Sequence, residues 1–202
     1  KLDSLSRYLE DTGSEALMIL ADGKIVYDWG NTDKKLLVHS IRKALLNSLY
    51  GIYIENGTID TTITIGQLKI DDINPLTEIE KTATIADLLK SRSGIYHTAA
   101  AVSEGMLASM PERGIHKPNE EYYYNNWDFN TLGYILEKQT GKTIFNLFNQ
   151  HIAQPLGMDY SNDYIIVKNP NDDWTIPNVD GGYQFEEDKS KYPAYHFRLS
   201  AK

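Results

Sequence analysis

The chain has 202 residues, of which 41% are hydrophobic and 11% aromatic, so it can build the core of one large domain or two small ones. Its formal net charge is −8 and no run of Lys or Arg occurs, which argues against nucleic acid and anionic membranes as partners. The absence of cysteine excludes disulfides, thiolate catalysis and zinc–thiolate sites, and no apolar run approaches the roughly 20 residues of a transmembrane segment.

Residues 1–35 are expected to form an N-terminal helix followed by a pair of strands. Apolar residues at helical spacing predict the helix, and a glycine ends it. The apolar run 16–21 and the segment 24–29 flank Asp22-Gly23, a dipeptide typical of a two-residue hairpin turn. No later strand is predicted to pair with this hairpin, although an isolated two-stranded ribbon is only marginally stable.

Residues 36–158 are expected to be mostly helical. From Ser40 the apolar residues recur at helical spacing until Asn56-Gly57 closes the pattern. The predicted buried stripe consists of Ile41, Ala44, Leu45, Leu49, Ile52 and Tyr53. Further helices are predicted after a capping box that joins Thr84 to Asp87, over 99–110, over 126–139 before Gly141, and from Thr143 to just before Pro155.

Residues 159–202 are expected to be an acidic loop region followed by the start of a truncated helix. The stretch 161–195 is rich in Asn, Asp, Pro and Gly, and it reads either as a functional loop or as a solvated insertion. Ser200 resembles an N-cap, yet the helix that it should open is absent. Together with the unpartnered hairpin, this predicts that the chain is the front part of a longer protein.

Ser40 and Lys43 stand at the start of the first helix of this middle region. Positions i and i+3 share a helix face, so the lysine amine can lie beside the serine hydroxyl. A partly desolvated lysine near other cations loses its proton more easily and can act as a base. The same spacing also fits an N-cap serine with a solvated lysine, so the spacing alone leaves both interpretations open.

A serine–lysine pair needs a third group that carries a proton to the leaving group, and a tyrosine near cations is suited to this. The sequence offers three Tyr-x-Asn readings. They are Tyr123 with Asn125, Tyr124 with Asn126, and Tyr160 with Asn162.

Several stretches, in this order, resemble the serine beta-lactamase and penicillin-binding-protein superfamily. The resemblance is closest to its class C beta-lactamase-like branch, which includes D-alanyl-D-alanine carboxypeptidases and esterases. The matching stretches are 37–43 with the nucleophile motif, 55–59, 84–95, 124–137, Pro155-Leu156-Gly157-Met158, and 197–201. The phase set by Leu132-Gly133 favours Tyr124 with Asn126 and rejects the other two readings.

The resemblance implies an α+β, beta-lactamase/transpeptidase-like fold, with a helical subdomain and an antiparallel sheet whose C-terminal strands are missing from this chain. It implies that Ser40 attacks a carbonyl to form an acyl-enzyme while Lys43 takes or relays the serine proton. Tyr124 then protonates the leaving group, and Asn126 binds Lys43 and the substrate amide. It implies a small-molecule or peptide substrate, no metal or organic cofactor, and a periplasmic or secreted location, and it leaves the oligomeric state open.

Two departures from the family pattern matter. Asn125 stands where Ser or Ala is usual, and the third motif, K-T-G or H-x-G, does not occur in 159–202. One interpretation is therefore a serine hydrolase acting on an amide or ester, as a beta-lactamase-like enzyme, a peptidase or an esterase. The alternatives are a non-catalytic penicillin-binding-like fragment or binding protein, and one segment of an enzyme whose remainder is elsewhere.

Other candidate residues are expected to be structural. His39 adjoins the nucleophile but points about 100° away on a helix. His97 and His116 are read as solvated loop residues and His151 as a surface or packing residue. Asp128, in the first turn of a helix, is expected to complement the helix dipole.

Overall fold

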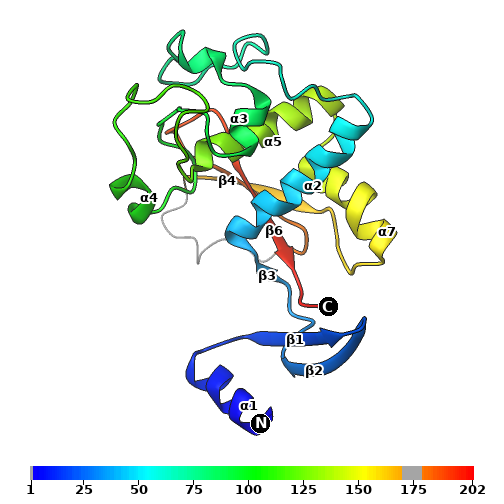
Figure 1. Ribbon diagram of the computed structural model, residues 1–202. Helices are drawn as coiled ribbons and strands as arrows, with labels where there is room; N and C mark the ends of the chain where they lie inside the picture. The colour runs from blue at the N-terminus through cyan, green and yellow to red at the C-terminus, as the bar shows by residue number, and fades with distance from the viewer. Residues whose placement is uncertain (1, 170–178) are drawn as a thin grey trace.

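The computed structural model describes residues 2–169 and 179–202. At the N-terminus, helix α1 (Leu2–Asp11) precedes strands β1 (Ala16–Ala21) and β2 (Lys24–Gly30). The two strands pair only with each other among the described residues. Asp22 and Gly23 both have positive φ angles, 49° and 74°, as a tight hairpin turn requires. The predicted helix and hairpin are therefore present, and Figure 1 shows them set apart from the rest of the chain.

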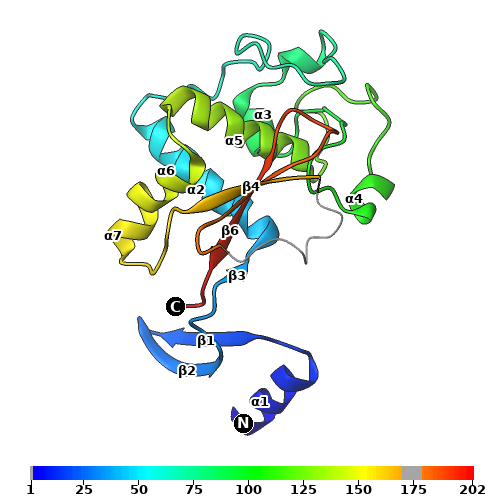
Figure 2. The same ribbon diagram turned by 180° about the vertical axis from the view of Figure 1, so that it is seen from behind.

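The rest of the chain packs helices against a four-stranded mixed sheet (Figure 2). The strand order is β3 (Leu36–Leu37), β6 (Ala194–Leu199), β5 (Gly182–Glu186), β4 (Tyr164–Lys168). β6 is antiparallel to both of its neighbours, whereas β4 and β5 are parallel. The helices are α2 (Arg42–Glu55), α3 (Ile85–Leu89), α4 (Glu104–Ala108), α5 (Asn126–Thr140), α6 (Ile144–Phe148) and α7 (Gln154–Leu156), with 3₁₀ turns at His39–Ile41 and Glu80–Thr82 and a π-helical turn at Asn149–Ala153.

The main core lies between these helices and one face of the sheet. Leu49 of α2, Leu132 of α5 and Phe148 of α6 are fully buried in it, together with Phe197 of β6. A smaller cluster covers the opposite sheet face and consists of Ala100, Tyr183, Phe185 and Ala194. Strand β6 thus lies between two packed layers, beside the start of α2.

The prediction of a loop over residues 159–202 is wrong for the described part of that range. Three strands, β4, β5 and β6, lie there, and the predicted loop residues 170–178 fall outside the described residues. The strands have β-branched and aromatic residues, which suit a pleated surface, but turn-forming residues dominate the segments between them. No helix begins at Ser200: β6 ends at Leu199, and the backbone N–H groups of Ala201 and Lys202 donate to the Thr32 carbonyl.

The predicted stripe of α2 is confirmed at Leu45, Leu49 and Tyr53, which pack in the main core, and is wrong at the start of the helix. Ile41 and Ala44 are exposed, whereas Arg42, Lys43 and Leu46 face inward. Asn126 and Asn130 on α5 accept hydrogen bonds from the two cations, and this makes their burial possible. The spacing of apolar residues gives no information about such polar partners. The helix predicted over 99–110 shortens to α4, and the helical path after α6 continues through Pro155 to Gly157.

Candidate active site

Ser40 lies in the 3₁₀ turn His39–Ile41, between β3 and the first residue of α2. It therefore precedes α2, whereas the sequence predicted it in the first turn of that helix. His39 has a φ of 40°, an uncommon backbone conformation for a residue other than glycine. The Ser40 side chain is exposed, and its hydroxyl has no hydrogen-bond partner among residues 2–169 and 179–202. The hydroxyl is thus accessible to a substrate.

Lys43 joins the two halves of the predicted site. Its amine donates to the Tyr124 hydroxyl at 3.0 Å and to Oδ1 of Asn126 at 2.6 Å. The same nitrogen lies 4.5 Å from the centre of the Tyr124 ring. Of the four predicted site residues, the structure links these three directly by hydrogen bonds. Ser40 lies three residues before Lys43, in the 3₁₀ turn that leads into α2.

The N-terminus of α5 fixes the position of Asn126. Oδ1 of Asn125 accepts the Trp127 backbone N–H at 2.6 Å, so Asn125 is the N-cap of the helix. Its amide nitrogen donates to the Ile95 carbonyl at 2.8 Å. The Asn126 side chain in turn donates to the Ala101 carbonyl at 2.6 Å. Asn125, which departs from the family pattern, is thus a strong capping residue in a position that needs one.

Burial and a neighbouring cation lower the pKa of Lys43, so that its amine can act as a base near neutral pH. Lys43 is 6% exposed, and burial, followed by the charge of Arg42, lowers its pKa to about 7. Arg42 is itself buried, and burial lowers its pKa to about 10, so it stays positively charged near pH 7. Its guanidinium donates to Oδ1 of Asn130 at 2.8 Å, a neutral partner. A lysine with a pKa of about 7 is available in its neutral form near pH 7 and can accept a proton.

Comparison with known proteins identifies the family of the chain. The family model described as Beta-lactamase matches residues 5–162. The chain belongs to the beta-lactamase family. An Escherichia coli K12 protein described as "Putative D-alanyl-D-alanine carboxypeptidase" is 25% identical, over 80% of this chain and 46% of that protein. The chain therefore spans about half the length of the curated relatives that it matches.

Solved structures show the same fold. A D-amino acid amidase from Ochrobactrum anthropi SV3 matches with a TM-score of 0.61 and 17% identity, over 79% of this chain and 51% of that one. The D-alanine carboxypeptidase AmpC from Burkholderia cenocepacia matches with a TM-score of 0.57 and 19% identity, over 78% and 47%. The α+β, beta-lactamase-like fold implied by the sequence is thus confirmed.

In this family member, sequence reasoning missed the role of a buried carboxyl group behind the site. Asp128 is fully buried, and its Oδ1 accepts from the Ser93 hydroxyl at 2.6 Å and from the Asn125 amide at 3.3 Å. Burial raises the pKa of its carboxyl group well above the usual range, which disfavours the charged form that would complement the helix dipole. It braces the N-cap of α5 instead.

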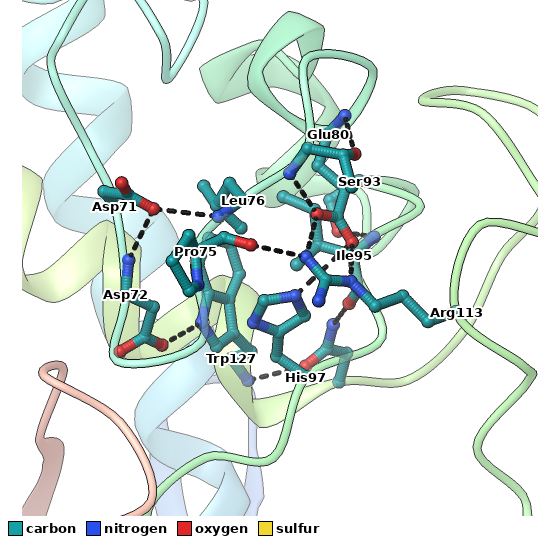
Figure 3. A network of polar contacts seen from close by, with 12 residues as sticks. Asp71, Asp72, Pro75, Leu76, Glu80, Ser93, Ile95, His97, Arg113 and Trp127 are labelled. Atoms are coloured by element: carbon teal, nitrogen blue, oxygen red, sulfur yellow. Dashed lines mark hydrogen bonds and ion pairs between the residues drawn. The ribbon is translucent and has the colours of Figure 1, made fainter.

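A second polar network supports the loops around α5 (Figure 3). Asp72 is buried and accepts from the Trp127 indole and from the Ser190 hydroxyl, both at 2.7 Å. Nearby, the Arg113 guanidinium donates to Glu80 at 2.7 Å. The network thus ties the chain before α3 to the residue that follows Asn126.

Three histidines that were expected to be solvated or at the surface are buried or hydrogen-bonded. His97, expected to be a solvated loop residue, is buried with Nε2 3.4 Å from a Glu80 oxygen, and burial lowers its pKa. His116 and His151 each share a hydrogen bond with a tyrosine hydroxyl, at 2.9 and 3.0 Å. The ring of His39 lies 6.2 Å from that of His196 on β6, a residue to which no sequence pattern pointed.

The described residues include no group of three or more His, Cys, Asp or Glu side chains that could hold a metal ion. None of the described helices is long and apolar enough to cross a membrane.

Proposed function

We propose that this beta-lactamase-family protein is a serine hydrolase that cleaves an amide or ester through an acyl-enzyme on Ser40. The observation that supports this most strongly is the Lys43 amine, which has a pKa of about 7 and hydrogen bonds to Tyr124 and Asn126. A general base works best when its pKa lies near the operating pH. A lysine built only for packing or for surface charge has no need of these features.

The proposed reaction has two stages. The Ser40 oxygen attacks the substrate carbonyl carbon, and the serine proton passes to neutral Lys43. As the bond to the leaving group breaks, the proton passes through Tyr124 to that group. Water then attacks the acyl-enzyme with the same groups reversed, which restores the Ser40 hydroxyl. Asn126 keeps Lys43 in place throughout.

The substrate is proposed from the relatives. They are named as a carboxypeptidase and an amidase, and both names describe cleavage at a carbonyl carbon. We extend a small-molecule or peptide substrate of this kind to the present chain, together with the periplasmic or secreted location implied by the family resemblance.

The second candidate function is a binding protein that retains the beta-lactamase fold and holds ligands without acylation. The hydroxyl of Ser40 favours it, because this hydroxyl has no hydrogen-bond partner among the described residues and the Lys43 amine donates to Tyr124 and Asn126 instead.

Pre-steady-state hydrolysis of a nitrophenyl ester separates the two functions. The proposed hydrolase releases a burst of nitrophenol equal to the protein concentration, and Ser40→Ala abolishes it. Tyr124→Phe keeps the ring over Lys43 but removes the hydroxyl, so it is expected to slow the burst by about 10²-fold or more. Absence of a burst, with equal reversible binding of a penicillin to the wild type and to Ser40→Ala, would establish the binding protein.

A further inference from the structure

Two neighbouring cations at the start of α2 are each held by an asparagine of α5. The Arg42 guanidinium donates to Oδ1 of Asn130 at 2.8 Å, just as the Lys43 amine donates to Oδ1 of Asn126. The two asparagines are four residues apart on α5, so their side chains lie on one face of that helix. Arg42 and Lys43 are therefore buried in the same interface between α2 and α5.

Two consecutive backbone carbonyls fix the orientation of both asparagine side chains. The Asn126 amide nitrogen donates to the Ala101 carbonyl at 2.6 Å, and that of Asn130 donates to the Ala100 carbonyl at 3.1 Å. Ala101 has a φ of 61°, and its own N–H donates to a carboxylate oxygen of Glu187 at 2.8 Å. Because each amide nitrogen faces a carbonyl, each amide oxygen must face a cation.

The surroundings of position 130 suit an amide and disfavour a carboxylate. The Asn130 nitrogen also lies 3.5 Å from the Tyr192 carbonyl oxygen. An aspartate has the same shape, but its second oxygen would face two carbonyl oxygens and could not donate to either while ionised. The fold thus gives Arg42 a neutral partner at the position from which a counter-charge could reach it.

The positive charge of Arg42 is therefore not compensated. Its side chain is buried, and no ion pair within residues 2–169 and 179–202 includes Arg42 or Lys43. A buried charge without a counter-charge is unfavourable for folding, and an apolar side chain would fill the space more stably. Charges held in this way are typical of functional sites.

The other titratable groups around the two cations, among the described residues, are tyrosines and histidines. They are Tyr124 before α5, Tyr183 of β5, Tyr195 and His196 of β6, and His39 of the 3₁₀ turn. Burial raises the pKa of Tyr195 well above its usual value and lowers the pKa of His196 well below its usual value. Both therefore favour their neutral forms near pH 7, and neither offsets the charge of Arg42.

We propose that Arg42 and Asn130 are positioning residues for the serine chemistry. Asn130 holds the Arg42 guanidinium beside Lys43 without neutralising it, and the charge of Arg42 disfavours the protonated form of the Lys43 amine. This rests on the proposed function for the role of Lys43 as the base, and it adds the device that keeps this base neutral. The two asparagines then have separate tasks: Asn126 holds the base, and Asn130 holds the charge that acts on it.

NMR of protein labelled with ε-¹³C-lysine measures the protonation of Lys43 without any substrate. The Lys43 signal is the one lost in Lys43→Met, and its titration midpoint in the wild type is expected near pH 7. Arg42→Gln can still donate to Asn130 but has no charge, so the midpoint is expected to rise by about one pH unit or more.

A second variant and a control complete the titration. Asn130→Asp keeps Arg42 but adds the counter-charge, so it is expected to raise the Lys43 midpoint as well, and it decides the matter if Arg42→Gln does not fold. Arg7→Gln makes the same charge change on exposed α1 and is expected to leave the midpoint unchanged. A Lys43 midpoint that is unchanged or lower in either folded variant overturns the proposal, as does a wild-type midpoint typical of an exposed lysine.

The pH profile of acylation by a nitrophenyl ester separates this proposal from the proposed function. If Lys43 is the base, the midpoint of the rate in Arg42→Gln rises with the NMR midpoint, and the rate at pH 7 falls about fivefold for a rise of one unit but recovers at higher pH. A purely structural loss lowers the rate by one factor at every pH. If the NMR midpoint rises but the midpoint of the rate does not, the proposed function is wrong and the effect of Arg42 on Lys43 stands. An unchanged NMR midpoint overturns the role of Arg42 whatever the rate does.

Discussion

The substitution Asn126→Asp tests whether the low pKa of Lys43 controls acylation. It places a carboxylate where the amide oxygen lies 2.6 Å from the Lys43 amine, and both side chains are buried. A negative charge there stabilises the protonated amine. The pKa of Lys43 is therefore expected to rise, while the shape of the site stays nearly the same.

The size of the effect follows from Coulomb's law. The carboxylate charge is shared by two oxygens, so the two unit charges are taken as about 4 Å apart; they then interact by about 4 kcal/mol at an effective dielectric constant of 20, which corresponds to about 3 pKa units. Because Lys43 starts from a pKa of about 7, the variant resembles an ordinary lysine. At pH 7 its neutral fraction falls from about a half to about one in a thousand. Acylation at pH 7 is then expected to slow by several hundredfold.

The assay is the rate of acylation by a nitrophenyl ester between about pH 6 and pH 10.5. In the wild type the rate is expected to rise through a midpoint near the Lys43 pKa of about 7 and then to level off. In Asn126→Asp the midpoint moves upward by about 3 pH units. The matched control is Asn47→Asp, an exposed position on α2, which is expected to leave the midpoint unchanged. A variant that is slower by one factor at every pH refutes the reasoning, because the loss then comes from geometry.

Three further predictions concern stability. Lys43→Met is expected to raise the free energy of unfolding by up to about 5 kcal/mol below pH 7, because the Lys43 pKa is lower in the folded protein than in the unfolded chain. Urea denaturation should show that this gain shrinks as the pH rises from 7 toward 10.5. A gain that does not depend on pH contradicts the prediction. Asp128→Asn is expected to be more stable than the wild type at neutral pH and to lose that advantage in acid. Burial raises the Asp128 pKa, so the stability of the wild type falls as the pH rises above 3.8. A wild type that gains stability relative to the variant as the pH rises over this range contradicts the prediction. Gly133→Ala is expected to lower the thermal midpoint, because the new Cβ overlaps the Tyr195 ring, at a cost of about 1–3 kcal/mol. Its control, Gly51→Ala on α2, meets open space and is expected to stabilise by about 0.5–1 kcal/mol, so two equal effects refute the packing argument.

Local signals in the sequence were sufficient where the cause is local. The capping box from Thr84 to Asp87 is present with both hydrogen bonds, and Gly141 ends α5 in a left-handed conformation as predicted. These features depend on a few adjacent residues. The pairing of Lys43 with Asn126 crosses more than 80 positions, so the family resemblance pointed to it and spacing could not.

Features that depend on tertiary partners were not predicted. The buried side of α2 includes Arg42, because Asn130 on α5 accepts its hydrogen bond. The predicted buried stripe was drawn from apolar residues alone, so it did not include Arg42. In the same way, β6 is a strand because β3 and β5 pair with it on both sides. That pairing also places His196 beside His39.

The most direct test of the central claim is the intact mass of the protein after incubation with a penicillin or a fluorophosphonate, followed by peptide mapping. One adduct per chain is expected on Ser40, formed faster as the pH rises through about 7 and absent from Ser40→Ala. An unchanged mass, or an adduct on another residue that persists in Ser40→Ala, would contradict it.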